Sequence, residues 1–119
     1  MEARTLTITV QPDWQGALRQ AAKAAFHASA YQGETLNFDS PSAFFSHMTE
    51  RRWALVNALL GAGELSVREL ARRVGRDVKR VHEDVSALAE LGLVERSARG
   101  GVVCPFADIH VDMHLRHAA

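Results

Sequence analysis

Cysteine is nearly absent from the chain, since Cys104 is the single cysteine among 119 residues. A lone cysteine excludes an internal disulfide framework, leaves only an intermolecular bridge open, and is typical of a reducing compartment. No apolar run approaches the roughly 20 residues that span a bilayer, and the amino terminus lacks the basic start and apolar stretch of a signal peptide. We therefore expect a cytoplasmic protein without a membrane segment.

The chain has no excess of either charge, because fourteen Lys and Arg residues balance fourteen Asp and Glu residues. Bulk charge therefore gives no support for nucleic-acid binding, and the distribution of charge must decide. Residues 1–48 are slightly acidic, whereas residues 68–80 carry only Glu69 and Asp77 against six basic side chains. Those six are Arg68, Arg72, Arg73, Arg76, Lys79 and Arg80. A neutral protein is thus predicted to carry a local basic surface.

Signatures of enzyme chemistry are also missing, including glycine-rich phosphate loops, serine elbows and paired carboxylates. Cys104 lies in an apolar Val-Val-Cys-Pro run that favours a buried thiol over a nucleophile. A metal-sensing site stays open as an alternative, because His110, Asp112 and His114 would share one strand face, with Cys104 and His117 near in sequence. The alternation with apolar residues explains the same pattern as a solvated strand face. We expect no enzymatic activity, no cofactor and no metal.

The amino-terminal part predicts a strand followed by a helix and a second strand. Residues 5–10 alternate, with Leu6, Ile8 and Val10 on one face, as in a half-buried strand. Residues 13–29 are rich in alanine with apolar residues at helical spacing, and residues 34–38 indicate a short strand. The Asp39-Ser40-Pro41 sequence indicates a cap with proline at the first helical position, and the short helix after it carries Phe44, Phe45 and Met48.

Three closely spaced helices are predicted next. The first runs from Thr49 to about Leu60, is stopped by Gly61 and Gly63, and should face inward with Trp53, Val56, Leu59 and Leu60. The second begins at a capping box in which Ser66 and Glu69 satisfy each other's free amides, and it ends near Val74. Gly75 supplies a short turn, and Asp77 caps a third helix. Its predicted inward stripe is Val78, Val81, Val85 and Leu88.

A glycine-tipped hairpin is predicted after the third helix, with residues 93–96 and 102–104 flanking residues 97–101. The alternation of Ile109, Val111, Met113 and Leu115 with polar residues indicates a final strand. This order of elements is the winged form of helix-turn-helix, in which the second motif helix enters a major groove. The predicted fold class is α+β, mainly helical, with a strand-helix extension over residues 1–48, a winged helix-turn-helix over 49–105 and a strand and tail over 106–119.

The polar face of the third helix carries the functional prediction. With Val81 and Val85 buried, about 100° per residue places Arg76 and Lys79 opposite them and Arg80 at the flank. Residues at the start of a recognition helix reach base edges, where Arg and Lys donate to guanine. We therefore assign base readout to Arg76, Lys79 and Arg80. Contacts to phosphate or from the wing are assigned to Ser66, Arg68, Arg72, Arg73 and Arg99.

A charged helix face can also be merely solvated. Lys79 with Glu83, or Arg80 with Asp84, would then be ordinary surface pairs four residues apart. A winged helix used only for protein contacts is the corresponding alternative at the level of function.

One segment of the chain resembles winged-helix regulators of the MarR-like type. It is Leu65-Ser66-Val67-Arg68-Glu69-Leu70-Ala71-Arg72-Arg73-Val74-Gly75-Arg76-Asp77-Val78-Lys79-Arg80-Val81-His82. The same holds for the segments from Asp84-Val85 to Arg96, for Phe38 to Pro41 and for Thr49 to Trp53, so the whole chain resembles a small branch of predicted prokaryotic DNA-binding regulators. Members of that branch are often encoded beside a small toxin, and the resemblance implies an antitoxin that represses its own operon. The chain lacks the long helical dimerisation arms of full-length MarR proteins, which speaks against their phenolic-ligand pocket.

Together these observations predict a homodimeric repressor that binds double-stranded DNA, with a cognate toxin as a further partner implied by the resemblance. The single motif per chain and the apolar faces of the terminal strands motivate the dimer, although these strands could instead pair within one chain. The alternative function is inhibition of a partner protein, with DNA binding secondary or absent.

Overall fold

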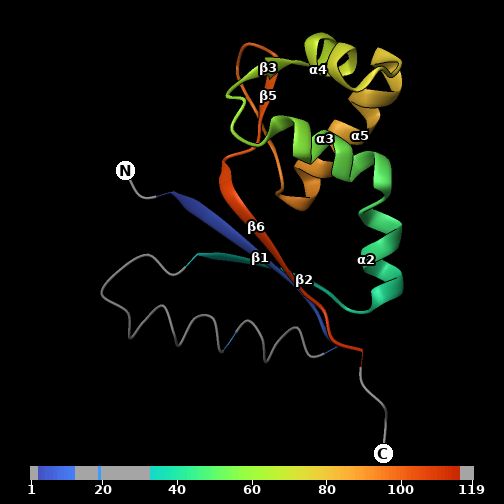
Figure 1. Cartoon of the computed structure of the whole chain (residues 1–119), viewed down its shortest axis with the longest axis vertical. Helices are drawn as coiled ribbons and strands as arrows, with labels where there is room; N and C mark the ends of the chain where they lie inside the picture. Colours follow the sequence, from blue (N-terminus) through green and yellow to red (C-terminus); the bar gives the residue numbers. More distant parts are fainter. Residues whose placement is uncertain (1–2, 13–18, 20–32, 116–119) are drawn as a thin grey trace, which may run out of the picture. The chain divides into compact units, whose positions relative to one another are not determined.

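The computed structural model describes residues 3–12, 19 and 33–115, and the predicted helix over residues 13–29 lies outside them apart from residue 19. In the described part of the chain, four helices and two three-stranded sheets form an α+β fold, as the sequence predicted (Figure 1). The chain divides into a first unit, residues 1–47 with 108–119, and a second unit, residues 48–107. Among the described helices, none has the length and apolar character needed to cross a membrane.

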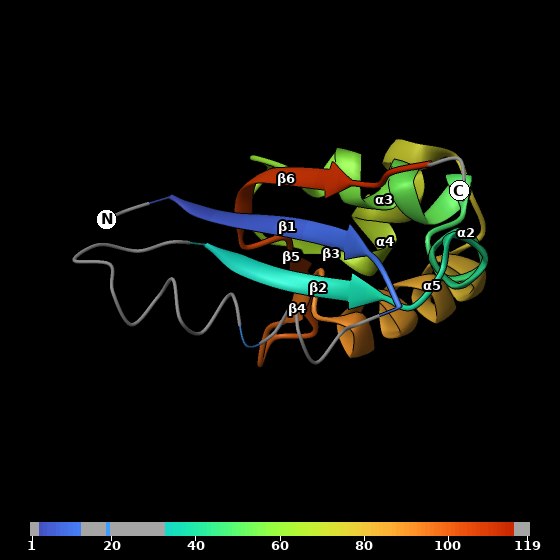
Figure 2. The same cartoon turned by 90° about the horizontal axis from the view of Figure 1, so that it is seen from below.

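The first sheet pairs the two ends of the chain. Its strands are β1 (Arg4–Val10), β2 (Glu34–Phe38) and β6 (Phe106–Asp112), in the order β2-β1-β6. Strands β1 and β2 are parallel, with Leu6 opposite Glu34, and Figure 2 shows all three strands running in the same direction. The terminal strands therefore pair within one chain in this structure.

The predicted alternation of β1 is confirmed, because Leu6 and Ile8 are buried while Val10 is half-buried. Helix α2 (Pro41–His47) begins as predicted, with the Ser40 Oγ accepting a hydrogen bond from the Ala43 backbone N at 3.1 Å. Its Phe44 is buried and meets Phe38 of β2 edge-on, with ring centroids 5.5 Å apart.

The prediction for the final strand was wrong in its limits and in its buried face. Strand β6 begins at Phe106, before the predicted residues 109–115, and ends at Asp112. Val111 is 37% exposed and Leu115 is 99% exposed, so the predicted apolar face is only partly covered. Alternation distinguishes the two faces of a strand, but it does not show whether anything packs against the apolar one.

The second unit contains three helices and the second sheet. Its elements are α3 (Glu50–Leu59), β3 (Leu65–Ser66), α4 (Val67–Val74), α5 (Val78–Leu91), β4 (Glu95–Arg96) and β5 (Gly101–Val103). The sheet order is β3-β5-β4 with antiparallel pairing, and β4 and β5 form the predicted hairpin. Helix α3 buries Leu55, Val56 and Leu59, whereas Trp53 and Leu60, predicted to face inward, are half-buried. The sequence pattern missed Leu55 because the buried face is centred on residues 55, 56 and 59.

Helices α4 and α5 are joined by the three residues 75–77. Gly75 adopts the left-handed conformation, with φ of 69°, and ends α4. Val81, Val85 and Leu88 of α5 are fully buried, which contributes roughly 1.5–3 kcal/mol each. Val78 was predicted to belong to this stripe, but it is 42% exposed. Side chains on a helix point toward its N-terminus, so that of the first residue projects beyond the helix end.

Candidate nucleic-acid interface

The first turn of α5 presents two free cations. Asp77 caps this helix, because its Oδ2 accepts a hydrogen bond from the Arg80 backbone N at 3.2 Å. The local sequence therefore fixes the residue at which α5 begins. The side chains of Lys79 and Arg80 are exposed, and neither makes an ion pair with any described residue. The surface pairs Lys79–Glu83 and Arg80–Asp84, considered from the sequence, are therefore not formed. Val78 adds an exposed apolar side chain beside these two cations.

Arg76 is placed differently from its predicted neighbours. It lies in the turn before α5 rather than on the helix, and its side chain is only 18% exposed. Its Nη2 donates to Asp84 Oδ2 at 2.8 Å, while Arg52 Nε donates to the other carboxylate oxygen at 3.1 Å. Burial raises the pKa of Asp84, but hydrogen bonds from Arg76 and Arg52 outweigh it and lower the pKa below its usual value. Asp84 thus ties the start of α5 to α3.

The arginines of α4 share one carboxylate. Arg72 Nη2 donates to Glu69 Oε2 at 2.5 Å, and Arg73 Nε donates to the same oxygen at 2.9 Å. These hydrogen bonds, that of Arg72 first, lower the pKa of Glu69 to about 2. The predicted capping box is therefore formed in one direction only: the Ser66 Oγ accepts from the Glu69 backbone N at 3.0 Å, while the Glu69 carboxylate turns to the arginines. Arg68 is exposed and makes no ion pair within the described residues.

Arg99 lies exposed in the turn between β4 and β5. Ser97 closes this turn, because its backbone N donates to the Gly101 carbonyl at 3.0 Å and its Oγ accepts from the Gly101 N at 3.0 Å. Gly100 supports it with φ of 85°, a conformation that few other residues adopt. A short, well-bonded hairpin therefore presents Arg99 at its tip.

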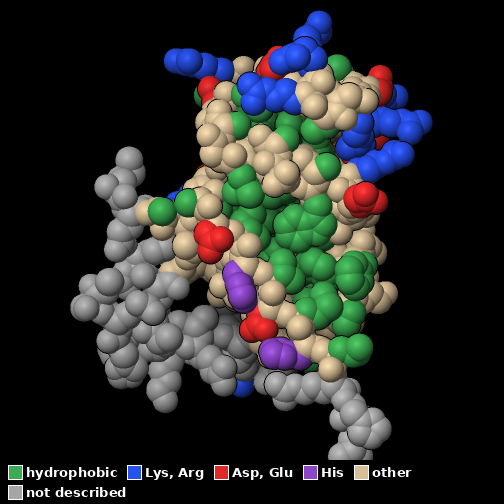
Figure 3. Space-filling model, viewed as in Figure 1, with side chains coloured by type: hydrophobic (Ala, Val, Ile, Leu, Met, Phe, Trp, Pro, Cys, Tyr) green, Lys and Arg blue, Asp and Glu red, His purple; other side chains and the backbone are tan. Residues whose placement is uncertain are grey.

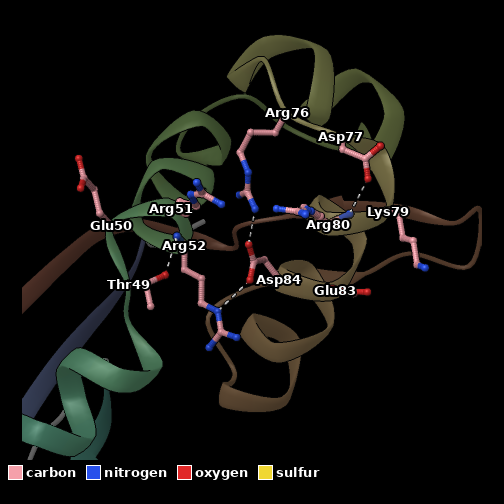
Figure 4. Close-up of a pocket in the computed structure, with 10 residues that line it drawn as sticks. All are labelled: Thr49, Glu50, Arg51, Arg52, Arg76, Asp77, Lys79, Arg80, Glu83 and Asp84. Atoms are coloured by element: carbon pink, nitrogen blue, oxygen red, sulfur yellow. Dashed lines mark hydrogen bonds and ion pairs between the residues drawn. The ribbon is translucent and has the colours of Figure 1, made fainter.

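An open groove of about 900 Å³ lies between the start of α3 and the start of α5 (Figure 4). It is lined by Thr49, Glu50, Arg51, Arg52, Arg76, Asp77, Lys79, Arg80, Glu83 and Asp84. A second hollow, of about 440 Å³, is lined by Ser66, Arg68, Glu69, Ala71, Arg72, Arg76 and Val78. Figure 3 shows Lys and Arg side chains gathered over the part of the second unit that carries α4 and the start of α5.

The structure thus groups most of the predicted site residues around two adjoining hollows, although Arg73 and Arg99 line neither of them. Sequence reasoning missed Arg51 and Arg52, which α3 brings to the groove. The Arg51-Arg52 pair directly after the Thr49 cap was the available signal.

The residues considered for metal binding do not form a cluster of ligands within the described part of the chain. His114 Nε2 lies 3.0 Å from Asp112 Oδ1, but no group of three or more His, Cys, Asp or Glu side chains that could hold a metal occurs among residues 3–12, 19 and 33–115. His117 lies outside the described residues. Cys104 is buried, and burial raises the pKa of its thiol. The arrangement gives this cysteine no activated thiolate.

Comparison with protein families gives a match over the second unit and part of the first. Residues 47–111, more than half of the chain, match the model of a protein family described as HVO_A0114. The matched region contains the whole groove and most of β6. No curated protein and no solved structure matches the sequence.

Proposed function

The chain belongs to the HVO_A0114 family, and we propose that it is a sequence-specific DNA-binding regulator of transcription whose second unit acts as a winged helix-turn-helix. In this proposal α4 and α5 are the two motif helices, α5 enters the major groove, and the β4–β5 hairpin is the wing. The match to the family model carries no function by itself, so the proposal depends on the site.

The observation that carries the proposal is the pair of exposed, unpaired cations at the start of α5. Lys79 and Arg80 can donate to the O6 and N7 atoms of guanine without first breaking an ion pair within the described residues. Val78, exposed beside them, suits the methyl group of thymine. Arg76 has a positioning role instead, because its guanidinium is engaged by Asp84 and its side chain is only 18% exposed.

The other exposed polar side chains of this surface suit phosphates. Arg68 of α4 and Arg99 of the hairpin are free of ion pairs within the described residues. Arg72 and Arg73 pair with Glu69, yet their side chains stay 72% and 44% exposed. Ser66, which caps α4, lines the hollow of about 440 Å³ together with Arg68 and Arg72. Phosphate contacts of this kind fix the register of a protein on the duplex but carry no sequence information.

The regulator is further proposed to be a homodimer that represses its own operon. Each chain offers one recognition helix, and two-fold dimers read inverted half-sites about one or two helical turns apart. The outer strands β2 and β6 of the first sheet offer edges at which a second copy could pair.

Selection of duplexes from a random pool, followed by binding measurements on the selected and a scrambled sequence, tests the proposal. We expect an enriched inverted repeat, and we expect Lys79→Ala or Arg80→Ala to cost about 1–3 kcal/mol on the selected duplex and to relax one base position. Arg4→Ala is the matched control, since Arg4 is an exposed arginine of the first unit that pairs with Glu34. Enrichment of a single half-site would reject the proposal that the protein binds DNA as a dimer. Failure to enrich any sequence would reject base readout and favour inhibition of a partner protein.

A further inference from the structure

We infer that Arg51 is a phosphate-binding residue at the start of α3, in the positive hollow that it lines with Arg76 and Arg80, and that its ligand is a backbone phosphate of duplex DNA. This inference rests on the proposed function and extends the DNA contact surface from α4, α5 and the hairpin to α3. Neither Arg51 nor this part of α3 belongs to the contact set predicted from the sequence.

The three side chains come from different elements and meet at one hollow. Arg51 lies on α3, Arg76 in the turn between α4 and α5, and Arg80 in the first turn of α5. With Asp77 they line an open hollow of about 560 Å³, and all four residues also line the larger groove. Figure 4 shows the guanidinium groups of Arg51 and Arg80 pointing toward Arg76 from either side.

The lining of this hollow is positive, because three arginines meet there with a single carboxylate, that of Asp77. Asp77 is engaged as the cap of α5, and Asp84 is shared by Arg52 and Arg76. Arg51 and Arg80 make no ion pair within the described residues. Guanidinium groups that converge in this way repel one another unless an anion lies among them. The planar donor fork of arginine matches the oxygens of a phosphate.

The position of the hollow favours a DNA phosphate over a free anion. Arg80 belongs both to this hollow and to the exposed first turn of α5, so a helix inserted in a major groove would bring the flanking backbone to Arg51. The hollow is open rather than enclosed, as suits a ligand that passes across the surface.

The test is fluorescence anisotropy with the selected and scrambled duplexes across a salt series, for wild type, Arg51→Ala, Arg51→Lys and the control Arg4→Ala. Loss of one phosphate contact should weaken binding to both duplexes about fivefold at physiological salt and lower the slope of log affinity against log salt by about one. The ratio of specific to non-specific affinity should stay unchanged. Arg51→Lys should restore the slope, and Arg4→Ala should match wild type.

Three results would overturn the inference. If Arg51→Ala binds both duplexes like wild type, the phosphate position is absent while the proposed function stands. If the variant instead changes the ratio of specific to non-specific binding, Arg51 reads a base. If inorganic phosphate titrated into the free protein stabilises wild type but not Arg51→Ala, and the DNA salt slope is unaffected, the site takes a small anion rather than DNA. A wild-type protein that binds no duplex would reject the proposed function itself.

Discussion

At the scale of single residues, Asp84 organises the candidate site. Its carboxylate accepts from Arg52 of α3 and from Arg76 of the turn, and its side chain is 18% exposed. Without it, Arg76 would keep a partly buried guanidinium with no carboxylate partner, and α3 and α5 would lose a direct link. The proposed base-reading residues follow Arg76 in the chain, so their placement depends on this pair of ion pairs.

We predict that Asp84→Asn lowers the free energy of unfolding by about 1–3 kcal/mol, because two charge-assisted hydrogen bonds lose their charged acceptor. The pKa of Asp84 is lowered in the folded protein, so its contribution is complete above the unfolded value, about 3.9, and is lost as the pH falls through the folded value. The wild type should therefore lose more stability than Asp84→Asn on acidification below about pH 4. Urea unfolding at several pH values measures both effects.

Glu83→Gln is the matched control for this prediction, because Glu83 is an exposed neighbour on α5 without an ion pair to any described residue. Glu69, whose pKa is also lowered, titrates in every variant, so the difference between wild type and Asp84→Asn isolates Asp84. Equal acid sensitivity of the two proteins would show that the ion pairs of Asp84 do not stabilise the fold.

At the scale of elements, the turn between α4 and α5 sets the direction in which the first residues of α5 point. Gly75 has φ of 69°, and a Cβ added there would meet no atom within 4 Å. Any cost of a side chain at this position therefore comes from the backbone conformation rather than from a clash.

We predict that Gly75→Ala destabilises the protein by about 1–2 kcal/mol and that Gly75→Asn costs less, because asparagine tolerates the left-handed conformation better than alanine. Chemical denaturation of the two variants measures the difference. An alanine variant as stable as wild type would mean that residue 75 does not adopt the left-handed conformation.

The limits of α4 and α5 could be predicted because their signals are local: Ser66, Gly75 and Asp77 act on backbone groups within a few residues. The interactions between elements could not be predicted in this way. Arg76 seemed exposed on a helical projection, but its partner Asp84 is 8 residues away in the sequence. The second arginine on that carboxylate, Arg52, is 32 residues from Asp84.

At the scale of the whole molecule, the sequence predicted the order of the described elements apart from the short strand β3, but not which strands pair. The sheet β2-β1-β6 joins both ends of the chain, and alternation within a strand carries no information on its neighbours. The candidate site was found because a neutral chain concentrates cations between residues 68 and 80. Arg51 and Arg52 lie outside that segment, and only the packing of α3 on α4 and α5 brings them to it.

The central claim is that the surface of α4, the start of α5 and the β4–β5 hairpin binds duplex DNA. Its most direct test is an NMR titration, in which the selected duplex is added to ¹⁵N-labelled protein. The backbone amide chemical shift of each described residue is recorded at every step. We predict that the largest changes occur at residues 66–73, 77–82 and 97–101, together with Arg51, and that a scrambled duplex shifts the same amides less. Changes confined to β1, β2 and α2, or no change at the start of α5, would contradict the account.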